Sequence, residues 1–181
     1  TAPQEVVSRG LIPAITIVGE KFQNGQIYIP EMMIAARAMS TTMEHFKEKL
    51  AGKGETKKLG TVVIGTVQGD LHDIGKNLVT MILKGQGFQV EDLGVSVSTA
   101  KFVQAVNDKK PEILAMSALL TTTMTEMKNT IDALKTAGLR DKVKVVVGGA
   151  PVTPAFAAQI GADGNAYDAP GAAKLCKDLL Q

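Results

Sequence analysis

Short apolar runs alternate with helix-like segments through residues 57–181, and this alternation limits the fold more than any other feature of the sequence. The first run, 61–67, is rich in β-branched residues and indicates a buried strand. We expect further strands at 88–93, 112–117, 143–147 and 162–166, and helices at 74–84, 99–108, 122–137, 153–160 and 170–180. Strand–helix units joined by short connections predict a doubly wound α/β domain with a five-stranded parallel sheet and right-handed crossovers.

Residues 1–56 carry a different pattern, that of two amphipathic helices followed by a polar, glycine-containing linker. The first helix is expected over 4–23, where Pro13 should kink it or mark a restart. The second begins near Pro30, and its apolar stripe includes Met32 and Met39. Two helices bury only part of such stripes, so this part should pack on the next domain, on further helices or on another protein.

The composition argues against several classes of function. The net charge is only +2, and 20 Lys and Arg are interspersed with 18 Asp and Glu, so nothing favours a nucleic-acid partner. No apolar run approaches the ~20 residues of a membrane helix. No basic and then apolar leader is found, so we expect a cytoplasmic protein without a membrane partner. The single cysteine, Cys176, forms no internal disulfide and is expected to be a buried structural thiol.

The loop after the first strand carries the most chemistry, and its residues are Gly69-Asp70-Leu71-His72-Asp73-Ile74-Gly75. It follows the carboxyl end of a parallel strand, which is where open α/β sheets bind ligands. Asp70 can hold one ring nitrogen of His72 and leave the other free for a metal. The alternative is structural, with Asp70 in a turn, Asp73 capping the helix and His72 in solvent. Spacing alone does not decide between these interpretations.

The loops after the other strands are rich in small and hydroxyl-bearing residues. They include Ser96, the stretch from Ser117 through Leu119 to Thr123, Gly148-Gly149-Ala150, and Tyr167. Such loops suit a large neutral ligand held by hydroxyls and backbone amides, although each alone is compatible with a plain turn or a helix cap. Three familiar sites do not fit. Gly65, Gly69 and Gly75 lack the dinucleotide spacing, the first loop lacks the aromatic rings and phosphate-loop hydroxyls of a flavodoxin, and Ser117 replaces the aspartate of a phospho-receiver.

The pattern Asp70-x-His72-x-x-Gly75, followed by Ser117-x-Leu119 and Gly148-Gly149, resembles the signature of the cobalamin (vitamin B12)-binding Rossmann-like domain. Upstream, residues 18–39 resemble the helical cap domain of methyltransferase corrinoid proteins. The resemblance implies a cobalamin-binding Rossmann-like (flavodoxin-like) domain over 57–181. It also implies a cap and linker over 1–56, and that cap is a partial bundle because only two of the four helices usual in the family are found.

The resemblance also implies a role for each matching residue. His72 would displace the corrinoid's own base and bind cobalt from below, Asp70 would accept the other imidazole N–H, and Gly75 would leave room for the displaced nucleotide tail. Further residues expected at the cofactor are Gly69, Leu71, Asp73 and Ile74 in the first loop, Ser117, Leu119, Thr121, Gly148, Gly149, Ala150 and Tyr167 along the tail slot, and Phe22 and Ile29 in the cap, with Met32 and Met33 as neighbours.

The function implied by the resemblance is that of a methyl carrier in a multi-component methyltransferase system, rather than a complete enzyme. It would accept a methyl group on Co(I) from a small methylated donor and pass it from methyl-Co(III) to tetrahydrofolate or a thiol. The expected partners are a substrate-specific methyltransferase, an acceptor methyltransferase and a reductive activase. The alternatives are the cobalamin-binding subunit of a B12-dependent mutase, which we would not expect to carry the cap sequence, and a B12 sensor module.

Overall fold

The sheet of the predicted α/β domain is present in the computed structural model, which describes residues 3–50 and 59–181. Its strands are β1 (Thr61–Thr66), β2 (Gln89–Asp92), β3 (Ile113–Ser117), β4 (Lys144–Gly148) and β5 (Gly164–Ala166). All pairs are parallel, and the order across the sheet is β2-β1-β3-β4-β5. The chain continues from β1 to β2 toward one edge of the sheet, and from β3 to β4 toward the other edge. The loops after β1 and β3 therefore lead away from each other, and such a point is where folds of this kind bind ligands. The predicted fold class is confirmed.

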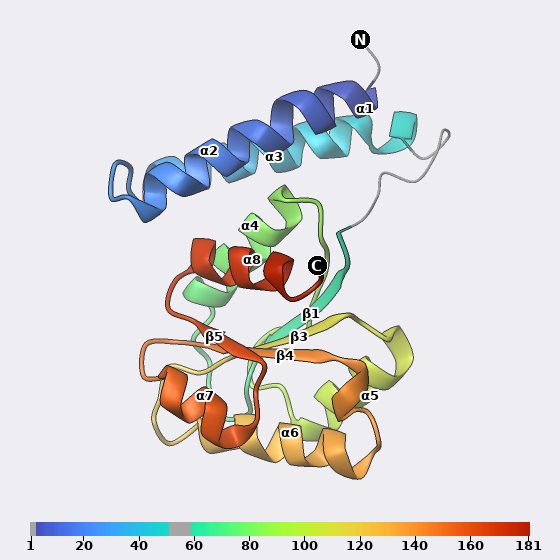
Figure 1. Ribbon diagram of the computed structural model, residues 1–181, viewed down its shortest axis with the longest axis vertical. Coiled ribbons are helices and arrows are strands. Elements are labelled where there is room, and N and C mark those ends of the chain that lie inside the picture. The colour runs from blue at the N-terminus through green and yellow to red at the C-terminus, as the bar shows by residue number, and fades with distance from the viewer. Residues whose placement is uncertain (1–2, 51–58) are drawn as a thin grey trace.

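Helices cover both faces of the sheet (Figure 1). One face carries α4 (Ile74–Gly85) and α8 (Ala169–Asp178), and the other carries α5 (Thr99–Lys109), α6 (Thr125–Thr136) and α7 (Pro154–Ile160). A short 3₁₀ turn, η2 (Arg140–Lys142), precedes β4. The central strands β1, β3 and β4 are buried on both sides and are therefore apolar: Val62, Val63 and Leu114 are fully buried.

The N-terminal part forms two long antiparallel segments, as the apolar stripes predict (Figure 1). The first consists of α1 (Pro3–Val6), the π-helical turn η1 (Val7–Leu11) and α2 (Ile12–Gln23), and the second is α3 (Ile29–Leu50). The π-helical turn lies directly before Pro13, whose missing N–H cannot continue a regular α-helical ladder. The expected kink at this proline therefore takes the form of a widened turn.

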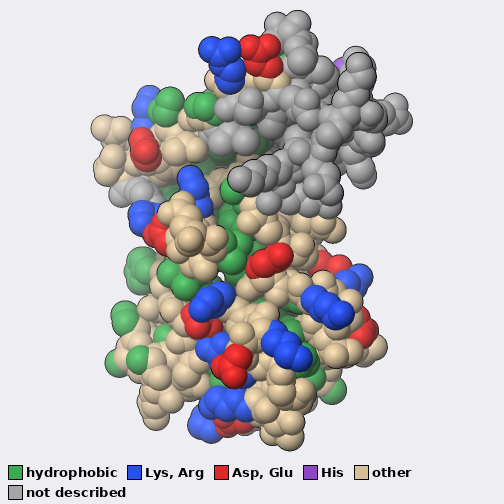
Figure 2. Space-filling model, turned by 45° about the vertical axis from the view of Figure 1, so that its right-hand side comes forward, with side chains coloured by type: hydrophobic (Ala, Val, Ile, Leu, Met, Phe, Trp, Pro, Cys, Tyr) green, Lys and Arg blue, Asp and Glu red, His purple; other side chains and the backbone are tan. Residues whose placement is uncertain are grey.

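The α2–α3 pair packs on α4 and α8, which is one of the three arrangements that its apolar stripes allow. Ile15, Met32 and Met39 are buried and share one hydrophobic core with Ile82 and Leu83 of α4. Figure 2 shows hydrophobic side chains in the hollow between the helical pair and the sheet domain. This packing brings the end of α2 next to the carboxyl edge of the sheet.

Two further findings concern membrane-spanning helices and the single cysteine. No helix among the described residues is both long and apolar enough to cross a bilayer. Cys176 on α8 is 1% exposed, which confirms that it is a buried thiol, and burial raises the pKa of this thiol to about 12.

Candidate functional site

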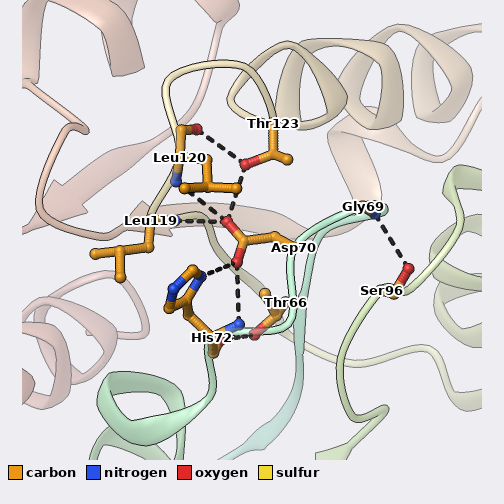
Figure 3. Close-up of polar contacts among 8 residues, drawn as sticks. All are labelled: Thr66, Gly69, Asp70, His72, Ser96, Leu119, Leu120 and Thr123. Carbon is orange, nitrogen blue, oxygen red and sulfur yellow. Dashed lines mark hydrogen bonds and ion pairs between the residues drawn. The ribbon is translucent and has the colours of Figure 1, made fainter.

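Asp70 is the centre of the polar network at the carboxyl edge of the sheet (Figure 3). Its side chain is completely buried, yet no Lys or Arg pairs with it in the described part of the chain. Oδ2 accepts hydrogen bonds from the Leu119 amide at 2.8 Å, the Leu120 amide at 3.2 Å and the Thr123 hydroxyl at 2.9 Å. The loops after β1 and β3 are thus joined through one carboxylate.

The other oxygen of Asp70 orients His72. Oδ1 accepts from the His72 backbone amide at 3.0 Å and lies 2.7 Å from the ring Nδ1. Burial alone would raise the pKa of Asp70, but the hydrogen bonds from His72, Leu119 and Thr123 outweigh it and hold this pKa well below its usual range. An ionised carboxylate only accepts, so Nδ1 is the donor of this hydrogen bond, and in the neutral form of the ring the lone pair then lies on Nε2.

The His72 ring is therefore fixed at one nitrogen and accessible at the other. Its side chain is 51% exposed, whereas that of Asp70 beneath it is fully buried. The backbone around the ring is held as well, because the Thr66 hydroxyl donates to the His72 carbonyl at 2.9 Å. This is the arrangement of a metal-binding histidine whose tautomer and orientation are set by a carboxylate behind it.

The loop after β2 braces the Asp70 loop from the opposite side (Figure 3). Ser96 accepts from the Gly69 amide through Oγ at 3.1 Å, and its own amide donates to the Asp70 carbonyl at 2.9 Å. To do so Ser96 adopts φ +48°, a left-handed conformation that is unusual for a residue other than glycine. The sequence predicts Ser96 at this edge of the sheet but does not predict this contact.

A cavity of about 550 Å³ extends from His72 down between the sheet and the α4 and α8 helices. This volume lies within the usual range for small-molecule and cofactor sites. The predicted cofactor-binding residues that line it are Phe22, Leu71, His72, Asp73, Ile74, Gly75, Ser117, Leu119, Gly148, Gly149, Ala150 and Tyr167. The loops after β1, β3, β4 and β5 and the end of α2 thus contribute to a single cavity.

The other predicted residues do not line the cavity. Asp70 lies behind His72, and Gly69, with φ +80°, turns the same loop. Thr121 is exposed and turned away, because a turn that closes from the Thr123 amide to the Leu120 carbonyl directs Thr123 inward instead. Within the predicted loop it is therefore Thr123, and not Thr121, that contacts Asp70. A run of equivalent threonines gives no signal to choose between them.

Of the residues predicted in the cap, some line the cavity and others do not. Phe22 lines the cavity, whereas the side chain of Ile29 lies outside the described residues. Met32 is 1% exposed because it packs in the core between the helical pair and α4, and Met33 is 46% exposed. Neither methionine lines the cavity.

Two glycines matter for the shape of the site. A Cβ on Gly75 would meet no atom within 4 Å, so this position on the cavity wall is open. A Cβ on Gly149, which has φ +130°, would come within 1.8 Å of the Ala118 carbonyl oxygen. Gly149 is thus required for the close approach of the β3 and β4 loops, and Gly75 leaves space beside His72.

A family model described as a B12 binding domain matches residues 60–174, and a second model with the same description matches residues 1–47. The chain belongs to the B12-binding family of corrinoid proteins. Trimethylamine corrinoid protein 1 of Methanosarcina acetivorans is 48% identical over 89% of this chain and 75% of its own length. Dimethylamine corrinoid protein 2 of the same organism is 41% identical over 98% of this chain and 82% of its own length.

A solved structure with the same architecture is the methanol:cobalamin methyltransferase complex MtaBC from Methanosarcina barkeri. It matches with a TM-score of 0.87 and 33% sequence identity, over 98% of this chain and 67% of that chain. The match extends over both the helical pair and the α/β domain, so this corrinoid protein shares the whole arrangement and not the sheet alone.

The residues present fit a corrinoid. Among the described residues, no group of three or more His, Cys, Asp or Glu side chains is placed to hold a metal ion. A metal at His72 must therefore bring its other ligands with it, as a macrocycle does. The cavity mouth also carries apolar side chains that nothing covers: Leu71 is 71% exposed, Ile74 85% and Tyr167 88%. Exposed apolar side chains gathered at a cavity are typical of a ligand-binding surface.

Proposed function

We propose that this corrinoid protein carries methyl groups from a methylated amine to an acceptor, and that His72 is the residue that would bind the cobalt of its corrinoid. The observation that carries the proposal is the imidazole held by Asp70 at 2.7 Å with its other nitrogen free above an apolar cavity. Neutral imidazole is a suitable ligand for cobalt. The bound corrinoid supplies a cobalt centre that accepts and releases the methyl group.

The protein's own residues have three tasks in this proposal. Asp70 holds the His72 proton on Nδ1 and strengthens Nε2 as a donor to the metal. Leu71 and Ile74 offer apolar contact beside the ring system, and Phe22 from α2 shields it from water. The slot between α4, α8 and the sheet receives the nucleotide tail.

The donor class follows from the relatives. Curated relatives that match nearly the whole chain are named as dimethylamine corrinoid proteins, and another is named as a trimethylamine corrinoid protein. We therefore assign a methylated amine rather than methanol or an aryl methyl ether as the donor.

The partners follow from the same role. The carrier needs a donor-specific methyltransferase, an acceptor methyltransferase and a reductive activase, because cobalt that has lost an electron must be reduced again. The solved methanol system is itself a complex of a methyltransferase with its corrinoid protein. We further propose that the working units are a cap and linker over 1–56 and a cobalamin-binding domain over 57–181, and that the protein acts in the cytoplasm.

Methyl transfer from different donors tests this function. The corrinoid-loaded, reduced protein is mixed with a purified methylamine methyltransferase and with dimethylamine, trimethylamine or methanol, and cobalt methylation is followed by absorption spectroscopy. We expect methylation from an amine with its matching methyltransferase and none from methanol with the same enzyme. Protein without corrinoid is the control. Methylation only in the presence of a methanol methyltransferase would contradict the donor, and no methylation by any of these systems would contradict the function.

A further inference from the structure

The cavity below His72 has two distinct levels that the strand register defines. The upper level is formed by Ser117, Gly148 and Ala166, which are neighbours in the parallel register. Thr66 of β1 continues this row but does not line the cavity. The lower level, which we call the floor, is the row Ile64, Ala115 and Val146, two residues earlier on β1, β3 and β4. Ile64, Ala115 and Val146 share one hydrophobic core with side chains of α4 and α8. The upper row faces the same helices, because side chains two apart on a strand point to the same side of a sheet.

The floor is apolar on every side. Its three residues line the cavity and are each less than 7% exposed. Facing them across the slot are further apolar side chains from the two helices: Leu78, Val79, Ala169 and Ala172. The backbone amides of β1, β3 and β4 at this level belong to the sheet. None of these seven side chains therefore offers a hydrogen bond to a group that reaches the floor.

The upper level adds little hydrogen-bonding capacity. The Thr66 hydroxyl already donates to the His72 carbonyl, and Gly148 and Ala166 have no polar side-chain group. Ser117 is left as the hydroxyl of this row. Ala115, between Ile64 and Val146, is the smallest side chain of the floor and leaves a recess suited to a flat ring.

Because the proposed function places the nucleotide tail in this slot, we infer that the floor selects benzimidazole-type lower bases over purines. This inference rests on the proposed function. A benzimidazole carries one free ring nitrogen, which one hydroxyl can satisfy. An adenine carries an exocyclic amine and several ring nitrogens, and most of these would lose water on the floor without gaining a partner. Leaving buried polar groups unpaired is costly, and an apolar pocket discriminates against added polar groups by roughly 10- to 100-fold.

Binding of three corrinoids to the apo-protein tests the inference without any methyl transfer. The ligands are cobinamide, which has no nucleotide tail, cobalamin, and the corresponding corrinoid with adenine as its lower base. Dissociation constants are measured by equilibrium dialysis. We expect cobalamin to bind roughly 10- to 100-fold more tightly than the adenine corrinoid, which should bind little better than cobinamide. Equal affinity for the two tailed corrinoids would overturn the inference.

Variants of the floor locate the selectivity. Ala115→Ser adds a hydroxyl to the floor, and Val146→Thr does so at nearly constant volume in case the first variant folds poorly. Either variant should lower the ratio of the dissociation constants of the adenine corrinoid and cobalamin several-fold. Ala157→Ser is the matched control, because Ala157 is equally buried but lies on the other side of the sheet. An unchanged ratio of dissociation constants in both floor variants would contradict the inference.

The binding experiment also separates the inference from the proposed function. If none of the three corrinoids bound, the proposed function would be contradicted as well. Equal binding by all three would contradict the inference alone.

Discussion

Asp70 is a buried carboxylate whose charge is stabilised by hydrogen-bond donors rather than by a cation. Its two oxygens accept from two groups of His72, from the amides of Leu119 and Leu120 and from Thr123. Each donor also fixes a loop, so the carboxylate sets both the proton position on His72 and the spacing of the β1 and β3 loops. At the residue scale, the site therefore depends on one acceptor being ionised.

The stability of the apo-protein should show this ionisation in acid. The pKa of Asp70 is lowered in the folded state, so its contribution is complete above the unfolded pKa of about 3.9 and is lost as the pH falls toward the lower folded value. We expect the free energy of unfolding of the wild type to fall below pH 4 with a component of up to about 1.4 kcal/mol per pH unit from this group. Urea titrations of wild type and Asp70→Asn at pH 6, 5, 4 and 3 measure it as their difference. A difference that does not change with pH would contradict the assignment.

Thr123 should contribute more to corrinoid binding than its neighbour Thr122. Thr123→Ala removes the hydroxyl 2.9 Å from Asp70 Oδ2 and should weaken corrinoid binding by about 10-fold, at the low end for residues that support a metal ligand. Thr122→Ala is the matched control because Thr122 is exposed, and it should bind like the wild type. Thr123→Ser should restore most of the affinity. Equal loss in both alanine variants would mean that the effect is not transmitted through Asp70.

Individual site residues were predictable from the sequence to different degrees. The pairing of Asp70 with His72 follows from their separation of two residues on one loop, and the structure places them 2.7 Å apart. The contacts of Thr123 and Ser96 were not predictable, because they join loops that are 53 and 27 residues apart in the chain. Only the folded sheet edge brings these loops together.

At the scale of elements, a buried ion pair fixes the start of α4 behind the histidine loop. Lys76 in the first turn of α4 has a side chain that is 2% exposed and pairs with Asp92 at the end of β2, and it also donates to Asn77 at 2.7 Å. Asp92 in turn accepts from the Gly94 amide at 2.9 Å. The pair thus connects α4, β2 and the loop that carries the bracing serine.

Breaking this pair should destabilise the apo-protein. Lys76→Met leaves Asp92 without its partner and should lower the free energy of unfolding by about 2 kcal/mol, less than the ~3–5 kcal/mol of a fully buried pair because Asp92 is 28% exposed. The double variant Lys76→Met/Asp92→Asn should recover part of this loss. Lys84→Met, an exposed position on the same helix, is the control. Urea unfolding measures all three, and a Lys76→Met variant as stable as Lys84→Met would contradict the role of the pair.

Element types and order were predictable because hydrophobic periodicity is strong in each strand and helix. Every strand lies within two residues of its predicted range. The largest difference at a helix start is α6, which begins at Thr125 rather than near 122. The residues before it form the turn that directs Thr123 to Asp70. They are therefore not part of the helix, although their sequence continues the helical pattern.

At the scale of the whole molecule, one hydrophobic core joins the helical pair to the α/β domain. Ile15 and Met39 of the pair share this core with Cys176 of α8 and with Val62 and Ile113 of the sheet. A Cβ on Gly85 of α4 would already lie 3.6 Å from the Met39 sulfur, so the two parts are in close contact. The position of Phe22 at the cavity is therefore set by the packing of the entire pair, which no local pattern in the sequence predicts.

Cys176 reports on the integrity of this core. With its thiol 1% exposed and its pKa raised to about 12, it should remain protonated and unreactive toward a disulfide reagent at pH 8 in the native protein. In denaturing urea we expect one thiol per chain to react, in parallel with the loss of helical circular dichroism. Fast labelling of the native protein would contradict the packing of α8 described above.

The proposed function requires that the His72 imidazole, held by Asp70, binds the cobalt. Electron paramagnetic resonance of the Co(II) form measures this binding, with protein labelled with ¹⁵N-histidine and an unlabelled corrinoid. We expect the nitrogen splitting of the cobalt signal to change from a triplet to a doublet on labelling and to disappear in His72→Ala. A triplet that persists in the labelled protein would show that the corrinoid's own base is the ligand, and the proposed role of His72 would be wrong.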